Sequence, residues 1–320
     1  MKVFVAGASG ALGVQLVPQL VAAGHEVVAM TRTSSKQDGL RALGARPVVA
    51  DALDPDAVAS VVGEAEPEVI VHQLTALSGK MTMRDARYPD RSSMAKMTNR
   101  LRTEATDHLL AAGRAVGARR FVAQSFGAFR YARTGGPVQT EDDPLDPSPP
   151  AAMRPAVEAL LHLEAAVTTI DWGEGLALRY GGFYGPGTSI SLDPDAQMAG
   201  PIRKRQFPIV GGGGGMMSFV HIEDAAAATA IAVESGEPGI YNIVDDEPAP
   251  VREWLPVLAD ALGAKPPRRI PRWLGRLVAG EAATLMMTEV RGASNAKARR
   301  ELGWQLRYPS WRLGFTKGLG

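Results

Sequence analysis

The chain has 320 residues, a formal net charge of +1, and an ordinary globular composition with 45% hydrophobic and 22% charged residues. This balance, with no basic stripe that carries interleaved aromatics, argues against nucleic-acid and membrane-surface partners. The absence of cysteine excludes disulfides, thiolate metal sites and cysteine nucleophiles, and the five scattered histidines lack the spacing of metal ligands.

The first half of the chain alternates short apolar runs with segments of helical periodicity. We expect strands at residues 3–5, 26–30, 46–50, 68–72, 119–124 and 176–179. We expect helices at residues 11–23, from 54 or 55 onward, at 94–116 and at 151–169. Such alternation predicts an α/β fold, a Rossmann-type doubly wound parallel sheet covered by helices on both faces. No run approaches the roughly 20 apolar residues that span a bilayer, so we expect a soluble, cytoplasmic protein.

Glycine and proline become frequent after residue 179. A helix at 223–234 and a strand at 240–244 still fit the sheet. The pattern therefore predicts two regions. Residues 1–178 and 217–245 form an NAD(P)-binding Rossmann domain, and residues 179–216 and 246–320 form a smaller substrate-binding region, or lid.

A glycine-rich turn lies between the first strand and the first helix, in the run Gly7-Ala8-Ser9-Gly10-Ala11-Leu12-Gly13. These glycines permit a tight turn, a close approach of the backbone to a pyrophosphate, and packing of helix on strand. The helix N-terminus adds free N–H groups and a positive dipole end. The motif therefore predicts a dinucleotide site, with Ser9, Ala11 and Leu12 beside the phosphates.

The residues after the second strand favour NADP(H) over NAD. An acidic residue at this point would bind a ribose 2′-hydroxyl, whereas an arginine suits a 2′-phosphate. No acidic residue occurs between Val27 and Lys36, and Arg32 stands there with Thr31 and Ser34. A guanidinium can make bidentate charge-assisted bonds to phosphate. NAD remains possible as the cofactor.

Two further strand ends supply the remaining candidate cofactor contacts. Ligands of doubly wound sheets lie beyond the carboxyl ends of the strands. We expect Asp51 at the end of the third strand to bind the adenine amino group, with Ala52 next to it. The chain after the fourth strand should pass the nicotinamide ribose at Gln73, Leu74 and Thr75.

Together these features resemble the extended and atypical branches of the short-chain dehydrogenase/reductase superfamily, the NAD-dependent epimerase/dehydratase family. The resemblance covers nearly the whole chain. Besides the glycine turn it includes Asn99 and Thr103, the run from Arg119 to Ser125, Tyr184-Gly185-Pro186-Gly187, Phe219 to Asp224, Tyr241-Asn242-Ile243 and Glu301 to Trp304. It implies an NAD(P)-dependent oxidoreductase or epimerase, and dimerisation through the helices at 94–116 and 151–169.

The catalytic pair that this resemblance implies is missing. Family enzymes usually combine a serine, here Ser125, with Tyr-x-x-x-Lys on a later helix, where the lysine lowers the tyrosine pKa for proton transfer. No lysine occurs between Lys96 and Lys204. If Glu164 is aligned with the glutamate common on that helix, Ala156 replaces the tyrosine and Leu160 the lysine.

Three interpretations remain open. The protein is an atypical reductase or isomerase with another proton donor, for which Tyr131, His162 and Tyr184 are candidates beside Ser125. Alternatively, water or the substrate supplies the proton. In the third interpretation the protein binds NAD(P)(H) as a sensor or scaffold without turnover.

The substrate is predicted to be a small or apolar carbonyl compound. The stretch after the five-glycine run is uncharged and begins with Met216, whereas nucleotide-sugar enzymes of the family usually carry an arginine there. Methionines suit an adaptable apolar wall, and Arg291 is a candidate to reach the cleft. A nucleotide-sugar epimerase or dehydratase is the further alternative.

Overall fold

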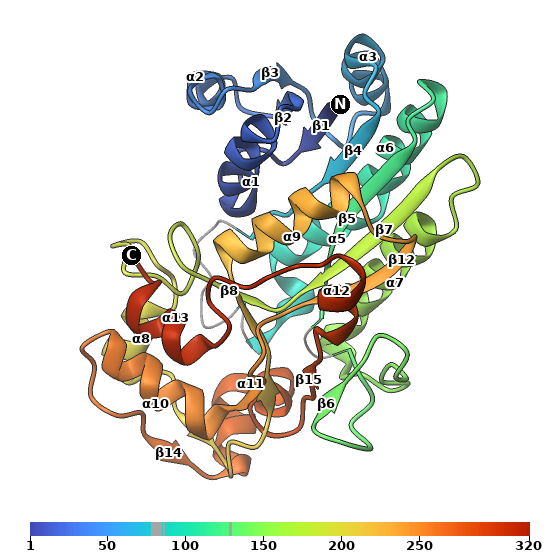
Figure 1. Cartoon of the computed structure of the whole chain (residues 1–320). Coiled ribbons are helices and arrows are strands. Elements are labelled where there is room, and N and C mark those ends of the chain that lie inside the picture. The colour runs from blue at the N-terminus through green and yellow to red at the C-terminus, as the bar shows by residue number, and fades with distance from the viewer. Residues whose placement is uncertain (78–84, 86, 128–129) are drawn as a thin grey trace.

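A seven-stranded parallel sheet forms the centre of the computed structural model, which describes residues 1–77, 85, 87–127 and 130–320 (Figure 1). The strands follow the order β12-β7-β5-β4-β1-β2-β3. Their bounds are β1 (Lys2–Ala6), β2 (Glu26–Thr31), β3 (Arg46–Val49), β4 (Val69–His72), β5 (Arg120–Phe126), β7 (Glu174–Tyr180) and β12 (Gly239–Ile243). The strand order reverses direction between β1 and β4, as in a doubly wound sheet. The predicted Rossmann-type fold is therefore confirmed.

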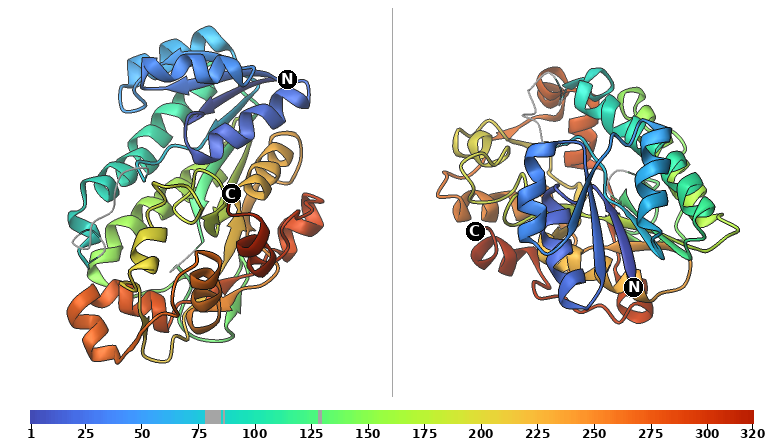
Figure 2. Two further views of the ribbon diagram at one scale, coloured as in Figure 1. Left: turned by 90° about the vertical axis from the view of Figure 1, so that its left-hand side faces the viewer. Right: turned by 90° about the horizontal axis from the view of Figure 1, so that it is seen from above.

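Helices cover both faces of this sheet (Figures 1 and 2). On one face α1 (Ala11–Ala22) packs against α9 (Ile222–Glu234), and on the other lie α3 (Pro55–Ala65), α6 (Glu104–Ala115) and α7 (Arg154–Thr168). Successive residues of β1 serve the two faces: Val3 and Val5 belong to the core under α1, Phe4 to the core under α3. Because helices bury both faces of the sheet, residues on both sides of the strand are apolar, and the strand appears in the sequence as a continuous apolar run.

The helix predicted at residues 94–116 is broken in two. α5 (Ser93–Arg102) ends and α6 begins at Thr103, whose φ of −105° and ψ of −80° are not helical. Its hydroxyl donates to the Asn99 carbonyl at 3.1 Å, a backbone acceptor within the preceding turn. A threonine hydroxyl that competes for backbone acceptors in this way bends a helix, which periodicity alone does not reveal.

The second region is built from strand pairs and helices that lie below the sheet in Figure 1. The pairs are β8 (Gly182–Tyr184) with β11 (Phe219–His221), β10 (Met216–Met217) with β13 (Ala249–Pro250), β9 (Ile209–Val210) with β14 (Arg269–Ile270), and β6 (Val138–Gln139) with β15 (Gly292–Ala293). The helices are α8 (Ala199–Arg203), α10 (Val251–Ala261), α11 (Arg272–Thr288) and α13 (Trp311–Lys317). Residues of β8, β9, β11, β13, α8, α10 and α13 form a separate core that contains Trp254, Phe219 and Phe315.

After β15 the chain returns to the central sheet before it reaches α13. α12 (Ala296–Glu301) packs against β12, and Ala298, Leu302 and Trp304 join the core under α1 and α9. The short α2 (Gln37–Ala42) and the 3₁₀ turns η1 (Ser34–Lys36), η2 (Pro89–Arg91) and η3 (Ala151–Met153) complete the described elements. Within the described ranges, no helix has both the length and the apolar character needed to cross a membrane.

Candidate functional site

The glycine turn after β1 has the form that the sequence predicts. Gly7 has a φ of +92°, a left-handed conformation that favours glycine, and its carbonyl accepts from the Gly10 N–H at 3.0 Å. A Cβ on Gly7 would lie 2.7 Å from the Gln73 carbonyl oxygen, and one on Gly13 only 2.4 Å from that of Ala8. The glycines thus hold the turn against β4 and the start of α1 against β1. The N–H groups at the start of α1, from Ala11 and Leu12, are free of helical acceptors.

The segment that carries Arg32 is tied to this turn. The Ser9 and Thr31 hydroxyls lie 3.3 Å apart within hydrogen-bond reach, and the Thr31 hydroxyl also accepts from the Thr33 N–H. Arg32 and Ser34 are exposed next to the turn. In the described part of the chain, the Arg32 guanidinium forms no ion pair or hydrogen bond. The arrangement leaves a free cation beside a helix N-terminus, as a phosphorylated ribose requires.

The segment after β3 is fixed by local contacts. Asp51 is exposed, and its carboxylate accepts from the Leu53 N–H at 3.0 Å. Ala52 is buried, and His108 of α6 lies 3.0 Å from its carbonyl oxygen through Nδ1. The exposed Asp51 carboxylate thus has one oxygen bound to the Leu53 amide, at the carboxyl end of β3.

In the segment after β4, the side-chain amide of Gln73 bears directly on the predicted cofactor site. Gln73 is 5% exposed, and both atoms of its side-chain amide are buried without a well-formed hydrogen bond to a described residue, although the Tyr180 hydroxyl lies close enough to interact with the amide. Buried amides are normally hydrogen-bonded, so an orphaned one suits a missing polar ligand. Its neighbours are fixed, since the Leu74 N–H donates to His72 and the chain past Thr75 is held by Thr98 of α5. The cradle of glycines and this orphaned amide fit a dinucleotide.

The Ser125 hydroxyl belongs to a buried network of charged side chains. Its hydroxyl donates to Glu164 of α7 at 2.6 Å and accepts from Arg130 at 3.2 Å. Glu164 also accepts two hydrogen bonds each from Arg130 and Arg179. All four side chains are at most 4% exposed. Burial opposes ionisation of Glu164, but the bonds from Arg179 and Arg130 outweigh it and lower its pKa to about 2.

Tyr131 is joined to the same network. Its hydroxyl donates to Asn242 of β12 at 2.8 Å and accepts from Arg179 at 3.2 Å. Burial raises the pKa of Tyr131 despite the adjacent guanidinium. The hydroxyl proton is therefore held on an internal acceptor.

The other two catalytic candidates are not brought together with Ser125. His162 lies on the outer face of α7, with its side chain 42% exposed and Nε2 2.8 Å from Asp107 of α6. Tyr184 is fully buried beside His221 and Phe315 in the second region's core. Burial raises the pKa of Tyr184, and its hydroxyl has no partner in the described part of the chain.

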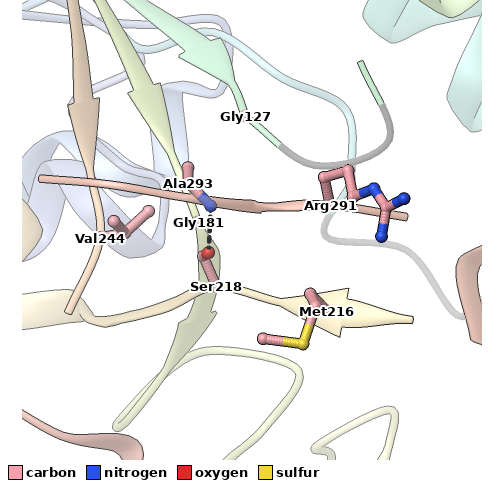
Figure 3. A pocket seen from close by; sticks show the side chains of 7 residues that line it. All are labelled: Gly127, Gly181, Met216, Ser218, Val244, Arg291 and Ala293. Atoms are coloured by element: carbon pink, nitrogen blue, oxygen red, sulfur yellow. Dashed lines mark hydrogen bonds between the residues drawn. The ribbon is translucent and has the colours of Figure 1, made fainter. Parts of the chain in front are cut away.

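A small cavity, with room for about one water molecule, opens at the carboxyl ends of three neighbouring strands. Gly127 follows β5, Gly181 follows β7 and Val244 follows β12, and all three line it. Figure 3 shows the remaining walls: Ser218, which accepts from the Ala293 N–H at 2.8 Å, Met216 and Arg291. The sequence candidates Met216 and Arg291 thus meet at the edge where ligands of such sheets bind. The Arg291 guanidinium donates to the Arg133 carbonyl, and its Nε is buried without a partner among the described residues.

The sequence assigned no site role to five residues, although Asn242 belongs to a motif of the family resemblance: Arg102, Arg130, Glu164, Arg179 and Asn242. Glu164 was visible only as an alignment point on the helix, and charged residues are seldom buried unless paired. The contacts of Arg130, Glu164, Arg179 and Asn242 depend on how α7, β7 and β12 meet, which no local pattern encodes. The described residues contain no group of three or more side chains arranged to hold a metal ion.

The comparisons with known proteins agree with this geometry. A family model described as "NAD dependent epimerase/dehydratase family" matches residues 3–244. A Streptomyces protein named 3-diazoavenalumate denitrifying reductase is 45% identical over 99% of this chain and 100% of its own length. The 2-alkyl-3-oxoalkanoate reductase of Stenotrophomonas maltophilia is 29% identical over 82% of this chain and 76% of its own.

Solved structures give the same fold at lower identity. The UDP-glucose 4-epimerase of Thermotoga maritima with UDP-glucose aligns with a TM-score of 0.75 at 19% identity, over 100% of this chain and 97% of the other. Human epimerase family protein SDR39U1 with NADPH aligns with a TM-score of 0.73 at 19% identity, over 100% and 99% of the two chains.

Proposed function

The chain belongs to the NAD-dependent epimerase/dehydratase family, and we propose that it is an NADP(H)-dependent reductase that acts on an aryl diazonium compound bearing a carboxylate. The family match and the relatives named as reductases indicate an NAD(P)-dependent oxidoreductase or epimerase. The interpretation of the protein as a cofactor-binding sensor without turnover is therefore not retained. The substrate and the choice of NADP(H) are the parts that we propose.

The observation that carries the proposal is the absence of a proton donor of the usual kind. The chain contains no Tyr-x-x-x-Lys sequence. The proton of Ser125 is held by Glu164, and that of Tyr131 by Asn242. A carbonyl group needs a proton on its oxygen when it is reduced, and these hydroxyls are committed to internal acceptors. A substrate that needs no proton matches the site better.

An aryl diazonium compound is a substrate whose reduction needs no proton. When bound, the reduced nicotinamide supplies a hydride that forms the new C–H bond while the C–N bond breaks, its electron pair leaving with dinitrogen, so that no proton is consumed. The name of the relative at 45% identity describes removal of nitrogen from a diazo carboxylate. The chain's own task is then to hold the two reactants in line and to exclude water.

The residues of the glycine turn support the cofactor half of the proposal. The amides at the start of α1 bind the pyrophosphate, and the unpaired Arg32 binds the 2′-phosphate. Asp51 and the orphaned Gln73 amide bind the adenine and nicotinamide ends, respectively. Each of these groups is exposed or without a partner where a ligand contact is needed.

Carbonyl compounds are the second candidate substrates. Two relatives at 29% identity are named as a ketoreductase and an oxoalkanoate reductase, in line with the sequence prediction. With these substrates water would have to supply the proton. They are therefore the natural competitors in an assay.

The test uses purified protein, 4-carboxybenzenediazonium and NADPH deuterated at either face of nicotinamide C4. We expect benzoate as product, dinitrogen release, and deuterium at the carbon that lost nitrogen, from only one of the two labelled cofactors. The stereospecificity separates enzymatic transfer from the background reaction without protein. Turnover of a panel of ketones and enones without any of the diazonium compound would contradict the proposal.

A further inference from the structure

Arg102 is a buried cation that has no partner among the residues that the structure describes. It is the last residue of α5 and is 6% exposed. Its guanidinium forms no hydrogen bond or ion pair with any residue that the structure describes, and its Nε is sealed from solvent. Buried arginines are almost always paired, since an unpaired buried charge is strongly unfavourable. An unpaired one within electrostatic range of the Ser125 network, where it senses Arg130 and Glu164, points to a ligand that supplies the missing negative charge.

The side chains around Arg102 increase the local shortage of negative charge. Arg130 and Arg179 share the single carboxylate of Glu164, so three guanidinium groups face one carboxylate. Glu141, whose carboxylate accepts from the Asn242 N–H, lies within electrostatic range of Arg179. Even with Glu141 ionised, the cluster keeps an excess of positive charge. We call Arg102, Arg130, Arg179 and Glu164 the arginine cluster.

His72 adds no charge to the cluster. Its Nε2 lies 3.2 Å from the Leu101 carbonyl and 3.0 Å from the Thr106 hydroxyl, and its Nδ1 accepts from the Leu74 N–H. Burial, opposed by the Leu101 contact and aided by the charge of Arg102, lowers its pKa to about 4. His72 is therefore neutral at physiological pH, and it neither pairs with Arg102 nor competes for an anion.

The position of the cluster suits substrate rather than cofactor phosphates. Ser125 is the second-last residue of β5, and it is hydrogen-bonded to both Glu164 and Arg130 of the cluster. The pyrophosphate cradle lies instead at the β1–α1 turn, and Arg32 follows β2. The Ser125 end of β5 is the place that the family resemblance assigns to the reacting groups. A negative group held there belongs to the molecule being reduced.

We propose that the arginine cluster is the subsite that recognises a carboxylate of the substrate, with Arg102 as the residue that binds it. This inference rests on the proposed function in naming the part of the substrate that is recognised. A carboxylate offers two oxygens in the planar geometry that a guanidinium fork matches. Burial and the charge of Arg130, only partly opposed by the charge of Glu164, lower the pKa of Arg102 to about 10, as expected of a buried cation that is short of negative charge.

The experiment compares 4-carboxybenzenediazonium with its methyl ester, which removes the negative charge and keeps the reacting carbon. For the wild-type protein we expect a KM at least about 30-fold lower for the carboxylate, the size expected for a buried charge pair. Arg102→Met should abolish that difference by raising the KM of the carboxylate alone, and Arg102→Lys should restore part of it. Arg100→Gln, on the exposed face of the same helix, is the matched control and should change neither KM.

Thermal unfolding provides a readout that does not depend on turnover. Without an anion, Arg102→Met should raise the Tm, because it removes an uncompensated buried charge; a purely structural arginine would lower the Tm when removed. Benzoate at millimolar concentration should raise the Tm of the NADPH-loaded wild type and not that of Arg102→Met.

Each result has a defined meaning. Equal KM values of the wild type for acid and ester, or loss of discrimination in Arg291→Gln but not in Arg102→Met, would overturn the carboxylate subsite while leaving the reductase proposal intact. Absence of turnover with both diazonium compounds would count against the proposed function. In that case the benzoate shift still decides the subsite, because a wild-type Tm that benzoate leaves unchanged would overturn it.

Discussion

Ser125 donates a 2.6 Å hydrogen bond to Glu164, so the serine of the expected catalytic set serves an internal carboxylate. The same carboxylate receives the guanidinium groups of Arg130 and Arg179. Glu164 thus connects the end of β5, the middle of α7 and the end of β7. The network around Ser125 is therefore organised around the fixed anion of Glu164, whereas the family resemblance implies a tyrosine and a lysine at Ala156 and Leu160 of the same helix.

Glu164→Gln should destabilise the protein by about 3 kcal/mol or more, the cost of leaving buried guanidinium groups without their counter-ion. Urea unfolding measures this loss. Glu158→Gln, on the exposed face of the same helix, is the control and should stay within about 0.5 kcal/mol of the wild type. A Glu164→Gln variant as stable as the control would show that the pairs contribute nothing net.

The same carboxylate predicts a stability change in acid. Its pKa is lowered from 4.5 to about 2 in the folded protein, with the bonds from Arg179 and Arg130 outweighing the opposing effect of burial. A depressed pKa gives stability that is present above the unfolded value and is lost as the pH falls through the folded one. The difference in unfolding free energy between wild type and Glu164→Gln should therefore be full at pH 6 and shrink between about pH 4.5 and 2. A difference that stays constant across this range would contradict the assignment.

The sequence predicted the sheet but not the charge cluster, for a physical reason. Alternation of strands and helices and the glycines of the first turn are local signals, and both were sufficient for the fold. The contacts of Arg130 with Glu164 and of Tyr131 with Asn242 span 34 and 111 positions. Such contacts depend on which helix faces which strand. The break at Thr103 was missed because a hydroxyl competing for a backbone acceptor leaves the apolar spacing intact.

Arg32→Ala should weaken NADPH binding by about 10- to 100-fold, since it removes charge-assisted hydrogen bonds worth about 1.5–3 kcal/mol. NADH binding should be unchanged, because NADH carries no 2′-phosphate. Titration calorimetry with each cofactor measures the two Kd values. Arg41→Ala, a nearby exposed arginine that pairs with Asp38, serves as the control. Equal loss of affinity for NADPH and NADH would remove Arg32 from the 2′-phosphate site.

Gly13→Ala should both destabilise the protein and weaken binding of either cofactor. Its new Cβ would lie 2.4 Å from the Ala8 carbonyl oxygen, so that α1 must move away from β1 and carry its N-terminal amides with it. Gly39→Ala is the matched control: nothing lies within 4 Å of its Cβ, and it sits in α2. The control should be stabilised by about 0.5–1 kcal/mol. Thermal unfolding and cofactor titration of the two variants, side by side, measure the contrast.

Tyr131→Phe separates a proton donor from a structural tyrosine. The variant leaves the side-chain Oδ1 of Asn242 without the Tyr131 donor and should cost about 1–3 kcal/mol of stability. If the reaction needs no proton, kcat for 4-carboxybenzenediazonium should stay within about threefold of the wild type, whereas loss of a general acid typically costs about 10²-fold or more. Stopped-flow absorbance of NADPH under single-turnover conditions isolates the hydride step from product release. If the hydride step were a hundredfold slower in a Tyr131→Phe variant that remains folded, Tyr131 would be identified as the general acid. Ketones would then be favoured over diazonium compounds as substrates.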